Sequence, residues 1–304
     1  VVVSLPILIG AILSGAPLFG AVAYWLAMAV AFCVLSLYYV FNTFAVSDVL
    51  GTPSRRMLSQ IWSFSYPLAI STFLTIFLTN LDILMIGYFL ESTQVGYYRA
   101  ITPFKEVAIF VLTSFSFLFF PVASQYYDQG KYNKLEDLYV ASTKWATILT
   151  FPLILTIGLF SKDIIRVLLG AEYTPGASAL SILVVGLFFR TVVGLNGDMV
   201  RIIDQTKIEM NAALIGLIVN FVLNVVLIPT YGIEGAAIAT VSGFIIYNLI
   251  EVIGIYRETR IHPFKLQNFK QLLIPLITGY VLAQLTIVRD LGIVELLLIG
   301  ISLV

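Results

Sequence analysis

The ionisable residues of this chain that could carry chemistry lie inside long apolar runs. Asp82 sits in residues 71–90, STFLTIFLTNLDILMIGYFL, a stretch long enough to cross a bilayer. Arg99, Lys105 and Arg190 have comparable surroundings. A charged side chain inside a membrane is costly, and it usually faces other protein groups or a water-filled cavity. We therefore take these four residues as candidates for a functional site.

A polar stripe leads along one helix to Asp82. At about 100° per residue its members fall within roughly one quadrant; they are Ser71, Thr75, Thr79 and Asp82. The opposite face carries Phe73, Phe77 and Leu84. The pattern predicts that the stripe faces other helices or a water-filled cavity. Asn80 lies off the stripe, and we expect it to bond to a neighbouring helix.

The partner of Asp82 has two interpretations. The turn FLEST is short, so that the flanking spans form a tight antiparallel hairpin. Asp82 and Arg99 then both lie roughly 10–12 Å from the turn, because a helix rises about 1.5 Å per residue. One interpretation is that they neutralise each other. The other is that Arg99 points elsewhere and Asp82 binds a coupling proton or cation.

Two further cationic residues, Lys105 and Arg190, are expected at a similar depth in the membrane. Lys105 lies roughly 18–20 Å from the same turn, and Arg190 lies about as deep in its own span. Glu106 is the only acid that we place near them at that depth. We expect the two cations to line an anion-binding cavity. The alternative is that Lys105 reaches the interface with its amine while Arg190 pairs with Asp82 or Glu106.

The composition sets the class of structure that must position these residues. The chain of 304 residues is 60% hydrophobic and 11% charged, whereas soluble domains are about 25% charged. Only helices or closed barrels satisfy the backbone in lipid, and the apolar runs lack the period of two that barrels show. We predict an all-α polytopic membrane protein with about ten transmembrane helices, at 1–16, 20–42, 64–90, 93–124, 140–160, 177–198, 210–229, 233–255, 271–288 and 291–304.

The loop charges predict the orientation. One set of alternate connections carries about eleven Lys and Arg residues and the other about five, so the first set is expected to be cytoplasmic. It includes the longest connection, 43–63, where Gly51-Thr52-Pro53 breaks the chain before Arg55. The chain lacks an initiator Met and begins and ends in apolar segments, so we expect it to be part of a longer protein.

A packed helical hairpin is predicted near residues 217–243. Asn220 and Asn224 are four residues apart and share one helix face, where they can bond to a neighbouring helix. Gly232 and Gly235 permit a tight turn and close helix packing.

Other chemistry finds little support in the sequence. A single cysteine, Cys33, excludes an internal disulfide framework, and His262 is the only histidine. We find no P-loop, Rossmann fingerprint or zinc-helix motif, and the net charge of zero does not favour nucleic acid. We expect no catalytic residue, metal or cofactor.

Four segments together resemble polysaccharide flippases, the Wzx-type members of the MATE-like superfamily. They are NLDILMIGYFLESTQVGYYRAITPF (80–104), FSKDIIRVLLGAEYTPGASALSILVVGLFF (160–189), NGDMVRIIDQTKIEMN (196–211) and NFVLNVVLIPTYGIEGAAIATVSGFIIYN (220–248).

The resemblance implies a MATE-like bundle of two six-helix lobes, present here as a truncated chain. Residues 1–42 would end the N-terminal lobe and 43–63 would link the lobes. Residues 64–256 would form the C-terminal lobe, and 257–304 the extra C-terminal helices. In the related lipid II flippases, a cationic cavity binds pyrophosphate with an Arg near the start of the eighth helix. Arg99 lies close to that place, with Ile101 as the alternative register.

The resemblance also implies a function in the cytoplasmic membrane. Such a flippase moves polyprenyl-pyrophosphate-linked oligosaccharide across the membrane by alternating access, with membrane lipid and polysaccharide assembly enzymes as partners, and H⁺ or Na⁺ as a possible coupling ion. A multidrug extruder of the same fold is the first alternative. A polyprenyl-linked glycosyltransferase and a purely structural subunit are the others.

Overall fold

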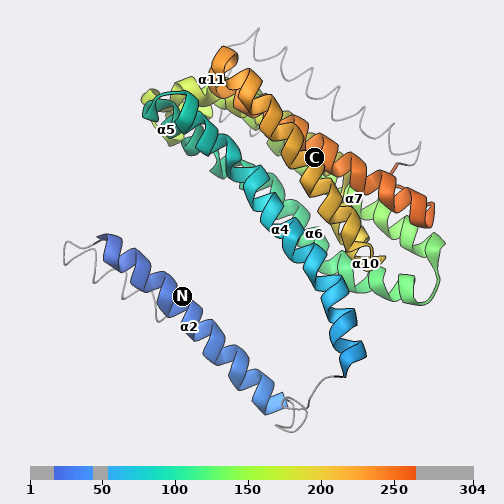
Figure 1. Ribbon diagram of the computed structural model, residues 1–304. Helices are drawn as coiled ribbons and strands as arrows, with labels where there is room; N and C mark the ends of the chain where they lie inside the picture. Colours follow the sequence, from blue (N-terminus) through green and yellow to red (C-terminus); the bar gives the residue numbers. More distant parts are fainter. Residues whose placement is uncertain (1–16, 44–53, 265–304) are drawn as a thin grey trace. The chain divides into compact units, whose positions relative to one another are not determined.

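The computed structural model describes residues 17–43 and 54–264 (Figure 1). Every regular element in these ranges is helical, which confirms the predicted all-α class. The chain divides into two units, residues 1–61 and 62–304. The predicted spans 1–16, 271–288 and 291–304 lie outside the described residues, so the predicted total of ten helices stays a prediction.

The first unit contains helix α2 (Pro17–Thr43), which matches the predicted span 20–42. Its 27 residues include no charged side chain. Large apolar side chains such as Trp25 and Phe32 are exposed on it. An uncharged helix with exposed apolar side chains fits a lipid environment.

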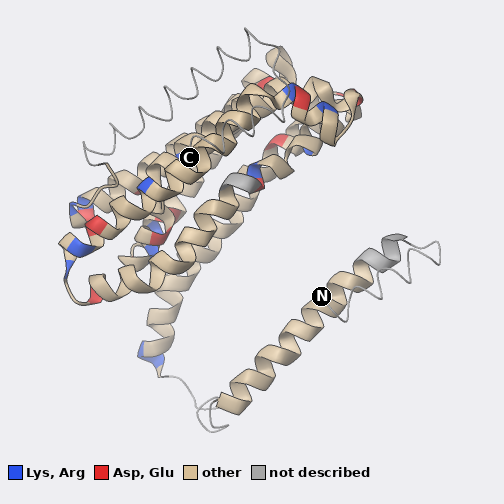
Figure 2. Cartoon of the chain, turned by 180° about the vertical axis from the view of Figure 1, so that it is seen from behind, with Lys and Arg blue, Asp and Glu red and all other residues tan. Residues whose placement is uncertain are grey.

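The second unit contains most of α4 and all later helices. They are α4 (Arg55–Phe89), α5 (Ser92–Ile101), α6 (Pro103–Asp128), α7 (Tyr132–Leu159), α8 (Ser161–Leu168), the 3₁₀ helix η1 (Ala171–Gly176), α9 (Ala177–Val193), α10 (Asn196–Ile202) and α11 (Thr206–Thr259). Six helical segments in the described ranges are long and apolar enough to cross a membrane. Figure 2 shows most of the charged residues of this unit near the ends of its long helices.

Several boundaries differ from those predicted, and three of them bear on the site. Helix α4 begins at Arg55, so it takes up the last part of the predicted linker 43–63. The predicted span 93–124 is divided between α5 and α6 just before Pro103, where proline lacks a backbone donor. The predicted span 177–198 is divided at Gly194, which has a φ of 77°.

Helix α9 lies at the centre of the second unit. It packs against α11, α7, α6 and α8. One hydrophobic cluster includes Ile86, Tyr98 and Leu180. A second includes Phe119 and Met199. Two clusters of buried polar side chains, described below, are built on the same helices.

The break at the end of α9 is held by side chains of α7. A helix end leaves backbone carbonyls without partners, and lipid cannot supply any. The Tyr139 hydroxyl donates to the Val193 carbonyl at 3.1 Å, and the Thr147 hydroxyl donates to the Thr191 carbonyl at 3.1 Å. A side chain on Gly194 would collide with Thr143, so this glycine serves both the positive φ and the close packing.

Helix α11 contains two of the predicted spans. Its 54 residues would extend about 80 Å as one straight helix, far more than a bilayer. Gly232 interrupts it with φ 60° and ψ −137°, and Figure 1 shows the chain turning back on itself. The two halves cross where a Cβ on Gly216 would lie 2.9 Å from the Gly243 carbonyl. The hairpin is therefore packed through glycines.

The packing of this hairpin can be tested at Gly235, where an added Cβ would collide with the Leu227 backbone. We expect Gly235→Ala to destabilise the protein by about 1–3 kcal/mol, because backbone atoms cannot move aside as a side chain can. Thermal unfolding in detergent would measure this as a lower Tm. Gly96→Ala is the matched control, since a Cβ there meets nothing within 4 Å. An equal effect of the two substitutions would contradict the packing.

Candidate functional site

Asp82 is the centre of a buried polar network. Its side chain is 0% exposed. Oδ2 accepts hydrogen bonds from the Tyr98 hydroxyl at 2.6 Å and the Thr240 hydroxyl at 3.1 Å. Oδ1 accepts from the backbone N–H of Ile83 at 2.9 Å. Helices α4, α5 and the second half of α11 thus meet at one carboxylate.

The network continues into the first half of α11. The Asn220 amide donates to the Thr240 hydroxyl at 3.2 Å, and the Asn224 amide donates to Asn220 Oδ1 at 3.1 Å. Both asparagines are fully buried. Oδ1 of Asn224 has no hydrogen-bond partner among the described residues. The predicted pair of asparagines therefore lies next to the predicted acid, which sequence spacing did not indicate.

Lys105 supplies the countercharge to Asp82. Its Nζ lies 3.8 Å from Oδ2, and its side chain is 12% exposed. The same ammonium lies 5.5 Å from the centre of the Tyr98 ring, where a cation–π attraction adds to the ion pair. Tyr98 and Thr240 hold the carboxylate more closely than Lys105 does.

Of the two interpretations, the one that pairs Asp82 with Arg99 was wrong. Arg99 is exposed on α5, and the carboxylate meets the preceding residue, Tyr98, and Lys105 instead. Equal depth in a hairpin does not fix which side of a helix a residue occupies, and Tyr98 and Arg99 are about 100° apart.

Asn80 also differs from expectation. We expected a bond to a neighbouring helix, but its amide donates to the Ile76 carbonyl of its own helix at 2.8 Å.

The polar stripe is buried unevenly. Ser71 and Asp82 are buried, whereas Thr75 and Thr79 are half-buried. The Thr79 hydroxyl donates to the Thr75 carbonyl at 2.9 Å, and the Ser71 hydroxyl has no partner among the described residues. Phe73, Phe77 and Leu84, on the opposite face, are exposed. The stripe as a route for a polar substrate stays a prediction.

A second buried polar cluster lies where α10 meets α11. The Asn196 amide donates to Asn248 Oδ1 at 3.0 Å and to Glu251 Oε2 at 2.6 Å. All three side chains are no more than 3% exposed. Arg190, which we predicted to bind an anion with Lys105, is half-buried and interacts electrostatically with Glu251. The two predicted cations thus belong to different acidic clusters.

Arg201 and Glu209 close the cytoplasmic turn expected between α10 and α11. Nε and Nη2 of the arginine donate to the two carboxylate oxygens at 3.0 and 2.8 Å. This pairing raises the pKa of Arg201. Burial raises the pKa of the nearby Asp198 carboxyl, because desolvation disfavours its charged form.

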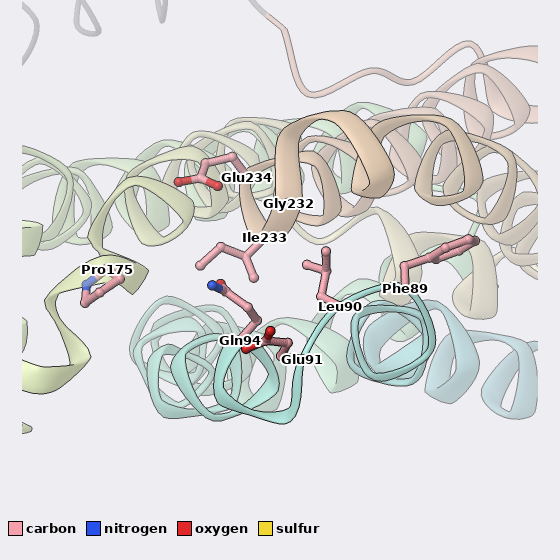
Figure 3. Close-up of a pocket in the computed structure, with 8 residues that line it drawn as sticks. All are labelled: Phe89, Leu90, Glu91, Gln94, Pro175, Gly232, Ile233 and Glu234. Carbon is pink, nitrogen blue, oxygen red and sulfur yellow. The ribbon is translucent and has the colours of Figure 1, made fainter.

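A pocket of about 650 Å³ lies at the end of the unit where α4 ends, α5 begins and α11 turns (Figure 3). Gln94, Glu91 and Glu234 contribute polar groups to its lining. Glu234 accepts a hydrogen bond from Ser178. Figure 3 shows Gln94 directed toward the space below Ile233. Amide and carboxylate groups of this kind can bond to the hydroxyls of a polar ligand.

Sequence reasoning missed Glu251, Asn196 and Tyr98. The signal for Glu251 was present, because the residue interrupts the apolar run of 241–256 just as Asp82 interrupts 71–90. Asn248 precedes it by three residues and shares its helix face. Tyr98 gave no comparable signal, because a tyrosine near a helix end is common at membrane interfaces.

The described ranges thus define a multi-pass helical membrane protein whose long helices bury charged and amide side chains. The sequence matches the MatE family model over residues 67–226. The match covers 160 of 304 residues, and the chain belongs to the MatE family. A model described as "Polysaccharide biosynthesis protein" matches residues 1–127.

Similar proteins include two archaeal proteins named as flippases. "Probable low-salt glycan biosynthesis flippase Agl15" of Haloferax volcanii is 28% identical over 67% of this chain and 43% of its own length. "Probable flippase AglR" of the same organism is 23% identical over 74% of this chain and 48% of its own. These matches confirm the predicted resemblance to polysaccharide flippases of the MATE-like superfamily.

A third relative is an uncharacterized membrane protein of Methanocaldococcus jannaschii. It is 26% identical over 88% of this chain and 53% of its own length. The chain therefore spans about half the length of the curated relatives that it matches.

The hydrogen bond between Tyr98 and Asp82 can be tested by Tyr98→Phe. We expect the loss of about 1.5–3 kcal/mol of unfolding free energy, because the acceptor is a buried carboxylate. Tyr97→Phe is the matched control. Its ring packs edge-on against Tyr173, and phenylalanine keeps that contact. Chemical unfolding in detergent measures both variants, and equal losses would argue against the bond.

The pairing of Lys105 with Asp82 can be tested by a double-mutant cycle. Lys105→Met leaves a buried carboxylate without its countercharge, and we expect a cost of about 3–5 kcal/mol. Adding Asp82→Asn removes that charge and should restore part of the stability. Strict additivity of the two single effects would show that the residues do not interact.

Proposed function

We propose that the protein to which this chain belongs is a transporter, not an enzyme, and that it flips lipid-linked oligosaccharide across the cell membrane. The observation that carries this proposal is the similarity of one chain to both the MatE and the polysaccharide biosynthesis models. The names of the two Haloferax relatives support it. Polyprenyl pyrophosphate is the proposed carrier lipid, and polysaccharide assembly enzymes are proposed partners.

The Asp82 network supplies a mechanism for coupling. A proton or sodium ion that binds Asp82 would compete with Lys105 for the carboxylate, because all three neutralise the same charge. The Lys105 ammonium would then be free to bind the pyrophosphate of the substrate. By linkage, pyrophosphate on Lys105 would favour ion binding at Asp82 by the same factor.

The geometry of the pair supports such competition. Lys105 stands at 3.8 Å, near the limit of an ion pair, and is partly exposed. Tyr98 and Thr240 keep the carboxylate in place when Lys105 leaves. Arg99 is exposed, so that it is available to the substrate, and Arg190 is half-buried. Their binding of pyrophosphate remains part of the proposal.

A multidrug extruder of the same fold is the second candidate. Such a carrier would need a carboxylate able to attract a cationic drug. In the described residues, the buried Asp82 already has a lysine as countercharge. This arrangement favours an anionic substrate over a cationic one.

Deletion and complementation test the function. Removing the full-length gene from its host should cause lipid-linked oligosaccharide to accumulate on the cytoplasmic face. Wild type should relieve the accumulation, whereas Lys105→Met should lower the flipping rate at least tenfold if the ammonium binds the pyrophosphate. Lys162→Met, an exposed lysine on α8, is the control and should complement fully.

Two results would contradict the proposal. If the deletion causes no accumulation but does cause sensitivity to cationic drugs, the protein is an extruder. If Lys105→Met flips at the wild-type rate, Lys105 does not bind the pyrophosphate. Expression of each variant in the membrane has to be matched before rates are compared.

A further inference from the structure

Glu251 is a buried carboxyl that the proposed mechanism does not use. It is 1% exposed, on the second half of α11. Its Oε2 accepts a hydrogen bond from the Asn196 amide at 2.6 Å. Its Oε1 is buried and makes no hydrogen bond of standard geometry among the described residues, although the Tyr247 side chain lies close enough to interact with the carboxyl as a hydrogen-bonding group. Tyr247 can therefore bond to the carboxyl, but it brings no positive charge.

Each packed element presents charged or titratable groups to Glu251. Arg190 comes from α9, Arg201 from α10, and Glu209 and Tyr247 from α11. Tyr139 of α7 also interacts with it. Asp198 of α10 belongs to the same cluster, through its interactions with Arg201 and Tyr139.

None of these groups neutralises Glu251. Arg201 gives two hydrogen bonds to Glu209, so its charge is already balanced. Arg190 acts on Glu251 electrostatically, but the two do not come within ion-pair distance in the described structure. Glu209 is an acid and opposes a second negative charge.

An ionised carboxylate is unfavourable in such a place. Burying a charge is costly unless it is paired and hydrogen-bonded, and a proton removes the charge at once. A metal ion fits poorly, because two arginines repel it. No three acidic, histidine or cysteine side chains converge on a metal position within the described residues.

We propose that Glu251 is a proton-binding site of this lobe, separate from Asp82, and that it holds its proton in the conformation described. On release the proton passes to water and leaves a carboxylate. No bond between heavier atoms changes. The carboxylate then draws Arg190, the nearby arginine that is not hydrogen-bonded to Glu209.

The location gives this exchange a mechanical consequence. Arg190 is in the last turn of α9, and Asn196 is the first residue of α10. The break at Gly194, with its φ of 77°, lies between them. Proton release would pull on Arg190 from one side of the break and change the bond to Asn196 on the other. Proton exchange at Glu251 would therefore act on residues at both sides of this break.

Infrared difference spectroscopy of the full-length protein in lipid nanodiscs tests the proposal. Spectra recorded from mildly acidic to alkaline pH should show the C=O stretch of one buried protonated carboxyl, which disappears at the higher pH. Glu251→Gln should remove this band. Glu209→Gln and Asp82→Asn should retain it, because those carboxylates are paired with Arg201 and Lys105. Asp198→Asn should retain it too, which separates Glu251 from the other buried carboxyl of the cluster.

The infrared bands of the variants decide whether Glu251 holds the proton. Loss of the band in Glu251→Gln alone supports the proposal, and its persistence there overturns it. Loss only in Asp82→Asn would assign the proton to the other network. If Glu251→Gln does not fold, wild type labelled with ¹³C-glutamate replaces it, and a band that does not shift overturns the proposal. The measurement follows protonation and not transport, so its result is independent of the substrate.

Discussion

The structure depends on one constraint: inside a membrane, polar groups must find their partners within the protein. Asp82 meets it with three hydrogen bonds and a lysine. Those contacts draw together α4, α5, α6 and the second half of α11. The network holds these helices together. It is also the place where an ion could act, because an ion that binds the carboxylate must displace one of these partners.

The same constraint explains how the helices can be interrupted. The chain breaks at Gly194 and turns at Gly232, both with a positive φ, and backbone groups at such interruptions lose their partners within the helix. At the first break, hydroxyls of α7 donate hydrogen bonds to carbonyls in the last turn of α9. These bonds hold the end of α9 against α7, so any change in its angle must exchange them for others. The buried Glu251 cluster lies beside this break, so that a change in the charge of Glu251 can act on the residues that flank the break.

The sequence predicted part of the site and missed part for definite reasons. Asp82 and Lys105 stood out because charges are rare in apolar runs. Their mutual pairing was missed because two helices in a hairpin can place either face inward, and depth alone favoured Arg99. Glu251 carried the same signal as Asp82 but lay in a segment that resembled ordinary hairpin packing. Gly216 and Gly243, where the hairpin crosses, differ in no way from other helix glycines until the two backbones are in contact.

The sequence by itself determined the environment of the chain and which residues can allow a turn. Apolar runs of bilayer length require membrane helices, since backbone groups in lipid must bond within their own segment. Glycine and proline allow turns because of their own backbone geometry. Only the tertiary structure decided which polar groups share a partner, since that depends on how each helix is rotated about its axis. Packing between distant segments fixes that rotation, and it placed Lys105 with Asp82 and Arg190 near Glu251.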